Sequence, residues 1–313
     1  MILHKTALTS FGSTTLFVLL WSSGAIFAKL GLDHASAFAF LVLRFALAFT
    51  VLLILGICRR RLLPSPRTRL RVAVTGLLLT GGYSICYLLA LDLGITPGVL
   101  ATVLGVQPIL TLILLERRFS IPRLIGLVLA MSGLLLVVYQ NIALTRFSVS
   151  GISFALAALG CMTIGAILQK GLRQRGVEVL PLQYGTSLLL CICFVPFQPI
   201  VIEFTTSFLI PLVWLGVVIS VVAQLLFYRL IQMGNLVNVT SLFYLVPVVT
   251  AAMDYFFLGN RLAPLSLIGM GAILLGLIQV FRNESPNRQT GSLTLSNSIS
   301  TGGVNPRLPA EKP

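Results

Sequence analysis

The chain has 313 residues, of which 57% are hydrophobic and only 10% are charged, with a mean hydropathy of +1.01 and a net charge of +14. This composition excludes an ordinary soluble domain, in which about 25% of residues are charged. It also excludes disorder over most of the length, because disordered chains are poor in apolar residues. The positive charges are scattered between apolar runs instead of forming a basic face, which excludes a nucleic-acid-binding function.

A helix needs roughly 20 apolar residues to cross the hydrocarbon core of a bilayer. The sequence contains ten suitable apolar runs, so we predict an all-α integral membrane protein with ten transmembrane helices and the lipid bilayer as its surroundings. The first run is too long for a signal peptide, and Lys29 separates it from the small residues Ala35-Ser36-Ala37. The predicted spans are 11–29, 36–57, 71–91, 96–115, 122–140, 151–170, 181–202, 208–230, 236–257 and 263–281.

Lysine and arginine are distributed unequally between the two sides of the predicted bundle. Of the 22 Lys and Arg residues, 18 fall on the side of the N-terminus, three on the other side, and Arg44 inside the second span. Cytoplasmic loops carry the excess of positive charge in membrane proteins. The count predicts that both termini lie in the cytoplasm of a bacterial inner-membrane protein, with Lys29 and Lys170 extending from helix ends to the membrane interface.

The last segment, 282–313, has Ser, Thr, Asn, Gly or Pro at 19 of its 32 positions. Such a segment buries too little apolar area to offset its ordering entropy, which predicts a disordered cytoplasmic tail. All five cysteines lie inside apolar runs, and no spacing of cysteine, histidine or carboxylate residues matches a metal site, a cofactor site or a catalytic constellation. We therefore expect no enzymatic activity, no bound metal and no cofactor.

The chain repeats itself at a spacing of 141–143 residues. The segment 24–29 recurs at 165–170 with four identities in six, and 117–138 recurs at 260–281 with seven identities in 22. The repeat divides the chain into a first five-helix unit, 1–145, and a second, 146–281. Because each unit has an odd number of spans, equivalent helices must cross the membrane in opposite directions. Inverted repeats of this kind are typical of transporters, although a pseudo-symmetric protein that moves nothing also fits.

Several local patterns carry a family resemblance over residues 11–281. They are Trp21-Ser22 with Lys29, Leu43-Arg44-Phe45, Tyr87 with Ala90-Leu91, Pro108, and Pro247 through Leu258-Gly259-Asn260-Arg261-Leu262 to Gly269 and Gly276. The chain resembles the EamA-type members of the drug/metabolite transporter superfamily, which have two tandem five-helix units. Asn260 stands where the family usually has Glu. The resemblance implies a ten-helix secondary transporter, commonly an exporter of amino acids or related metabolites.

Arg44 is the most costly polar residue in the predicted spans, since a central Arg is unfavourable by about 2.5–3.5 kcal/mol on insertion scales. One interpretation is a cation that attracts a carboxylate-bearing substrate. The other is a structural Arg that is bonded to backbone carbonyls or to a neighbouring polar group.

Tyr83 and Tyr87 are spaced i, i+4, so they share one face of the third span. Adding 141 gives Gln224 and Tyr228 in the eighth span, again at i, i+4. Two inverted helices with polar groups at equivalent positions are expected to face each other across a central cavity. The alternative for the tyrosines is a place in the interfacial aromatic belts.

Four further residues complete the predicted cavity: Trp21, Gln107, Gln183 and Tyr244. Pro108 and Pro247 interrupt the backbone hydrogen bonding of spans four and nine, as hinges for alternating access or as static kinks.

We therefore predict a secondary transporter that exports amino acids or related small metabolites by alternating access, with a small-molecule substrate as its partner and a homodimer left open. A nucleotide-sugar carrier or another metabolite or drug carrier is the alternative within transport, and a membrane scaffold is the alternative outside it. A diphosphate would require more buried cations than Arg44 alone.

Overall fold

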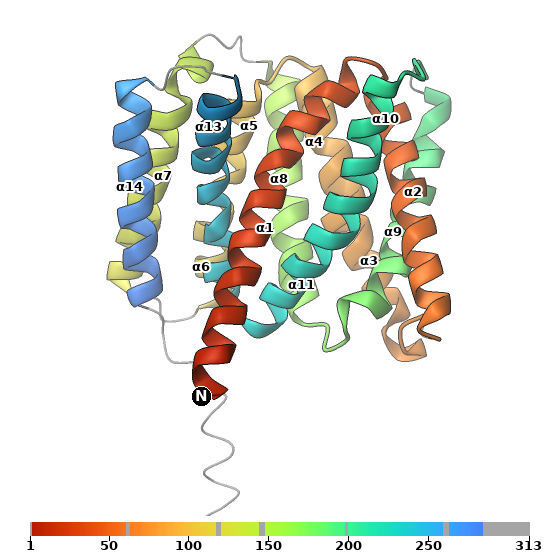
Figure 1. The fold of residues 1–313 in the computed structure, drawn as a ribbon, viewed down its shortest axis with the longest axis horizontal. Helices are drawn as coiled ribbons and strands as arrows, with labels where there is room; N and C mark the ends of the chain where they lie inside the picture. Colours follow the sequence, from red (N-terminus) through yellow and green to blue (C-terminus); the bar gives the residue numbers. More distant parts are fainter. Residues whose placement is uncertain are drawn as a thin grey trace, which may run out of the picture.

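The computed structural model of the chain describes residues 2–60, 63–116, 120–143, 148–197, 200–258 and 263–283. Helices make up almost all of this part, in which the single β pairing is a bridge between Ala35 and Ile202. Ten of its helical segments are long and apolar enough to cross a membrane, which confirms the predicted fold (Figure 1). The predicted tail beyond residue 283 lies outside the described residues, as do Arg117, Arg118, Asn260 and Arg261.

Several spans consist of more than one helical element. The first five spans are α1 (Ile2–Leu32); α2 (Ala37–Cys58); η1 (Pro66–Thr68) with α3 (Arg69–Gly76), η2 (Leu77–Gly82) and α4 (Tyr83–Asp92); α5 (Pro97–Leu104) with α6 (Gln107–Leu115); and α7 (Ile121–Ala143). The last five are α8 (Val149–Lys170); α9 (Gly176–Phe194) with η3 (Val195–Phe197); α10 (Thr206–Val213) with η4 (Trp214–Ala223) and α11 (Gln224–Met233); α12 (Leu236–Ser241) with η5 (Leu242–Tyr244) and α13 (Leu245–Leu258); and α14 (Pro264–Arg282).

Side-chain caps mark where several of these helices begin. Thr96 accepts a hydrogen bond from the amide of Val99 at the start of α5, where Pro97 is the first helical residue. Ser148 and Thr205 cap α8 and α10 in the same way. A hydroxyl at this position satisfies one of the amides that a helix N-terminus leaves without a partner.

The seventh span begins five residues earlier than predicted. Its segment runs from Gly176 to Phe197, whereas the apolar pattern predicted 181–202. The prediction placed Pro181 at the start of the helix, where proline is favoured. In the structure Pro181 lies inside α9, where it removes one backbone hydrogen bond, and Ile202 belongs to the loop that pairs with Ala35.

Spans four and nine are interrupted at equivalent places. Span four breaks between α5 and α6, just before Pro108, and span nine passes through the short turn η5 just before Pro247. Each proline lacks the amide that would continue an α-helical hydrogen-bond ladder. The two halves therefore share the same irregularity at their centre.

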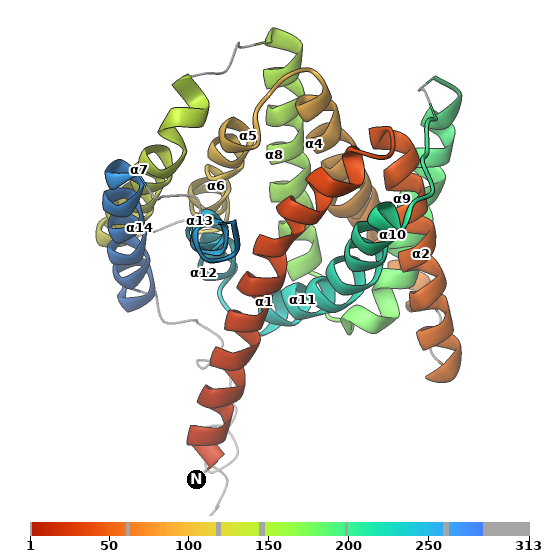
Figure 2. The ribbon, with the colours of Figure 1, turned by 45° about the horizontal axis from the view of Figure 1, so that its top comes forward.

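Helices from the two halves pack in the pairs that an inverted repeat requires. Spans two and seven pack together, as do five and ten, through α2 with α9 and α7 with α14. Span three packs on span six, through α4 and α8. Their equivalents in the other half, spans eight and one, also pack together, through η4 and α1. Figure 2 shows α7 and α14 together at one edge of the bundle and α2 and α9 at the other.

The crossing of α7 and α14 shows the inversion at the level of single atoms. A Cβ added to Gly133 would lie 2.5 Å from the carbonyl oxygen of Gly269, and one added to Gly276 would lie 2.5 Å from that of Gly126. At the repeat spacing of 143, Gly126 is equivalent to Gly269, and Gly133 to Gly276. The contact between Gly133 and Gly269 is thus repeated by their equivalents, Gly276 and Gly126, as expected for a two-fold axis that relates the two helices.

Candidate functional site

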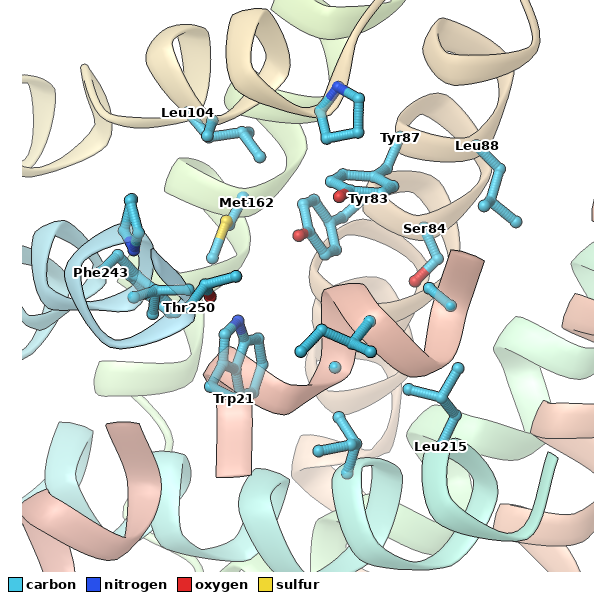
Figure 3. Close-up of a pocket in the computed structure, with 18 of the residues that line it drawn as sticks. Trp21, Tyr83, Ser84, Tyr87, Leu88, Leu104, Met162, Leu215, Phe243 and Thr250 are labelled. Atoms are coloured by element: carbon cyan, nitrogen blue, oxygen red, sulfur yellow. The ribbon is translucent and has the colours of Figure 1, made fainter. Parts of the chain in front are cut away.

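A cavity of about 480 Å³ lies in the centre of the bundle, and both halves of the chain contribute to its walls (Figure 3). Its lining reaches Ala28, Leu88 and Pro97, which are close to the helix ends that flank loops 33–36 and 93–96. These loops lie on the side opposite the N-terminus, because α1 starts on the other side and crosses the bundle once (Figure 1). The cavity therefore extends from the middle of the bundle toward the side opposite the N-terminus.

Six of the nine residues that the sequence nominates for this cavity belong to its lining: Trp21, Arg44, Tyr83, Tyr87, Gln107 and Gln224. Tyr83 and Tyr87 project from one face of α4 with ring centroids 5.8 Å apart. Trp21 and Thr250 lie across the cavity from these two tyrosines (Figure 3). Gln107 is buried, and its Nε2 has no hydrogen-bond partner among the described residues. The lining thus combines apolar walls with a few polar groups, as small-molecule sites do.

Arg44 provides the positive charge of the cavity. Its Nε donates a hydrogen bond to Oγ of Ser220, at 2.9 Å, from α2 to η4. Among the described residues, no carboxylate lies within ion-pair distance of Arg44. Tyr83, Tyr87 and Tyr184 line the same cavity as Arg44. The one hydrogen bond of Arg44 to a described residue is therefore to a neutral hydroxyl.

The two halves share an uncommon backbone feature next to the cavity. The π-helical segment η2 ends directly before Tyr83, and the π-helical segment η4 ends directly before Gln224. Tyr83 and Gln224 are 141 residues apart, so the two wide turns occupy equivalent positions of the repeat. Such turns are rare and concentrate at functional sites. The apolar pattern of the sequence contains no signal for them.

The other three nominated residues lie outside the lining, in buried hydrogen bonds. Tyr228 donates its hydroxyl proton to Gln183, which in turn donates to Gln169. Tyr244 donates to the carbonyl oxygen of Gly105, at the break between α5 and α6. The equivalence of Tyr87 and Tyr228 therefore does not extend to their contacts: the first faces the cavity and the second ties α11 to α9. Of the proline pair, Pro247 lines the cavity and Pro108 is buried next to it.

Four aromatic rings pack together at the end of the cavity on the side of the N-terminus, and three of them belong to its lining. Phe17, Trp21, Phe227 and Phe243 are in mutual contact, with ring centroids 5.2–5.8 Å apart in every pair. The rings come from α1, α11 and η5, so the cluster joins spans one, eight and nine. We call these four residues the aromatic floor.

Buried polar groups hold the chain together on the N-terminal side of this floor. Arg123, at the start of α7, pairs with Glu116 and donates to Oδ1 of Asn235 and Asn238, at 3.1 and 2.6 Å. Asn235 also caps α12. Nothing in the sequence distinguishes Arg123 from the other loop arginines, because its partners are up to 115 residues away along the chain.

Lys170, which is expected from the sequence to extend to the membrane interface, is hydrogen-bonded to the end of a neighbouring helix. Its Nζ donates to the carbonyl oxygens of Ile231 and Gly234, each at 2.6 Å, and to that of Gln232 at 3.3 Å. These carbonyls lie at the C-terminal end of α11, where a helix has unsatisfied acceptors and a partial negative charge. The side chain of Lys29, its equivalent in the first half, lies outside the described residues, as does that of Asp254.

The family model described as the EamA-like transporter family matches this chain twice, over residues 12–139 and 149–282. The chain belongs to the EamA-like transporter family. As an EamA-like transporter it is a multi-pass membrane protein of the drug/metabolite transporter superfamily, a group of transporters and not of enzymes. No group of three or more potential metal ligands gathers in the described part of the chain.

No curated protein matches the sequence. A solved structure, described only as a crystal structure of a protein, is 20% identical and covers 86% of this chain and 98% of its own, with a TM-score of 0.73. At this identity the likeness concerns the fold.

Proposed function

We propose that this EamA-like transporter exports amino acids or related small metabolites that carry a carboxylate, by alternating access of one central site. The observation that carries the proposal is the position of Arg44, a cation that lines the cavity and has no carboxylate partner among the described residues. A charge in the bilayer interior is unfavourable, so an anionic substrate that pairs with it gains binding energy. An arginine suits a carboxylate because it can donate two parallel hydrogen bonds.

The remaining lining supports a small amphiphilic substrate. Tyrosine hydroxyls and the unpartnered amide of Gln107 offer hydrogen bonds, while the rings of Trp21 and Phe243 offer apolar contact. A cavity of about 480 Å³ is in the range of small-molecule sites. Arg44 is the one cationic residue in the described lining, which does not favour a nucleotide sugar, since its diphosphate calls for several cations.

The two sides of the cavity support alternating access. The structure has the features of a state that is closed on the N-terminal side, by the aromatic floor and by the polar contacts of Arg123, and that leads to the opposite side. We place the N-terminal side in the cytoplasm of a bacterial inner membrane from the distribution of lysine and arginine. This state is then the one that releases an exported substrate. If each repeat adopted the conformation of the other, the cavity would open to the N-terminal side and load the substrate.

Comparative mass spectrometry of the medium tests the proposal. Cells that overproduce the wild type should enrich one class of carboxylate metabolite in the medium, and cells with Arg44→Gln should not. Tyr228→Phe is the matched control, because it removes a buried hydroxyl outside the cavity. Equal enrichment by the wild type and by Arg44→Gln would contradict the assigned site, and the absence of any enriched carboxylate would contradict export.

A further inference from the structure

Ser220 connects spans two and eight next to the cavity. It lies in η4 of span eight, its side chain is fully buried, and its Oγ accepts the hydrogen bond from Nε of Arg44 in span two. Tyr184 of span seven, which lines the cavity, is fully buried as well. A serine hydroxyl oxygen has two lone pairs, so it can accept the hydrogen bond from Arg44.

This contact restricts how the guanidinium can be used. The group is planar, with one donor at Nε and four at the two terminal nitrogens. Ser220 occupies the Nε donor, and no hydrogen bond links the terminal nitrogens to a described residue. With Nε held from the side of η4, the edge formed by the two terminal nitrogens is the one left for a ligand. Two parallel hydrogen bonds from that edge match the two oxygens of a carboxylate.

The arrangement is present in only one half of the repeat. At a spacing of 141, the residue equivalent to Ser220 is Leu79, and the residue equivalent to Arg44 is Gly185. The cavity is therefore electrically polarised although its walls are pseudo-symmetric. A substrate with one carboxylate has a single place for that group, between spans two, seven and eight.

We propose that Ser220 is a positioning residue that fixes the orientation of Arg44 and thereby sets the preference of the cavity for carboxylates. The proposal rests on the proposed function, in which Arg44 binds the carboxylate of the substrate. Ser220 itself does not need to touch the substrate. Its removal leaves the charge in place but frees the guanidinium to rotate, which weakens the match to a carboxylate more than the binding of an uncharged analogue.

The test compares two probes that differ only in the acidic group, 3-phenylpropanoate and its amide. Their affinities for the purified full-length protein in detergent are measured by isothermal titration calorimetry, and the readout is the ratio of the two affinities. The variants are Ser220→Ala, Ser220→Thr and Arg44→Gln. The control is Ser241→Ala, which removes an equally buried hydroxyl that bonds only within its own helix, to Val237 and Asn238.

The wild type should prefer the acid, and Ser220→Ala should reduce that preference about tenfold, as expected for a lost hydrogen bond to a charged group. The affinity for the amide should stay the same, Ser220→Thr should retain the preference, and Ser241→Ala should match the wild type. If Ser220 had a purely structural role, Ser220→Ala would lower the affinities for the acid and for the amide equally. If Ser220→Ala does not fold, Ser220→Cys gives the same comparison, because a thiol is a weak acceptor of similar shape.

Two results would overturn the inference in different ways. If Ser220→Ala keeps the preference of the wild type while Arg44→Gln loses it, Arg44 binds the carboxylate without help from Ser220, and the proposed function stands. If the wild type binds the acid and the amide equally well, the carboxylate site itself is wrong, and both the function and the role of Ser220 fall.

Discussion

The substitution Gly133→Ala tests the close approach of α7 and α14. The new Cβ would lie 2.5 Å from the carbonyl oxygen of Gly269 and 2.8 Å from the amide nitrogen of Ile273, both of which are main-chain atoms. Non-bonded atoms are at their best separation at about 3.5–4.0 Å. The two helices must therefore move apart by roughly 1 Å, and a gap of that order loses a quarter to a half of the dispersion energy at each contact.

The expected loss of stability follows from two opposing effects. Overpacking of a well-packed interface costs about 1–3 kcal/mol. Replacement of a helical glycine by alanine stabilises the folded state by about 1 kcal/mol, because alanine has the higher helix propensity. The control is Gly271→Ala in α14, where nothing lies within 4 Å of the added Cβ, so the control receives the propensity gain alone. Thermal unfolding in detergent should place Gly133→Ala below the wild type and Gly271→Ala at or above it.

The two-fold relation adds a second requirement. In Gly276→Ala the new Cβ would lie 2.5 Å from the carbonyl oxygen of Gly126 and 2.7 Å from the amide of Ala130, which repeats the geometry at Gly133. The two substitutions should therefore lower the unfolding temperature by the same amount. A Gly133→Ala protein as stable as the Gly271→Ala control would refute the close approach. A loss at Gly133 without an equal loss at Gly276 would refute the symmetry.

Three further substitutions test the closed side of the cavity. Arg123→Gln leaves the partly buried carboxylate of Glu116 without its cationic partner, so thermal unfolding should show a loss of about 1–3 kcal/mol, which Arg123→Lys recovers only in part because it lacks the planar fork. Trp21→Ala removes a ring of the aromatic floor and should speed hydrogen exchange in α11, measured by mass spectrometry; the exposed Leu16→Ala should not. Tyr244→Phe loses its bond at the α5–α6 break and should lower stability by about 1 kcal/mol in the same unfolding assay.

The fold follows from local properties of the sequence. Apolar runs of the right length determine the ten spans, and the repeat with its odd number of spans determines the inverted pairing that the glycines of α7 and α14 display. The error in span seven had a local cause as well, since Pro181 resembles a helix start and in fact lies inside α9. A local rule places the start of the helix at such a proline. The structure instead continues the helix through Pro181, because tertiary packing tolerates one missing hydrogen bond.

The site was predictable only in part. Polar residues inside apolar runs pointed to Arg44, Tyr83 and Gln224, because such residues need a reason to be in the bilayer interior. The sequence did not reveal Ser220 as the partner of Arg44, since a lone serine in a span fits many environments and the two residues are 176 positions apart. The repeat also overstated the similarity of its halves, because it placed Tyr228 in the cavity.

The aromatic floor also gives the protein a built-in optical probe. The chain has two tryptophans: Trp21 is part of the floor, and Trp214 donates a hydrogen bond to Ser23 and stacks on Phe27. In a Trp214→Phe background, all tryptophan emission comes from the ring that separates the cavity from the N-terminal side. If the floor opens, Trp21 becomes exposed to water and its emission shifts to longer wavelength. Opening and closing of the floor can then be followed by fluorescence without any attached label.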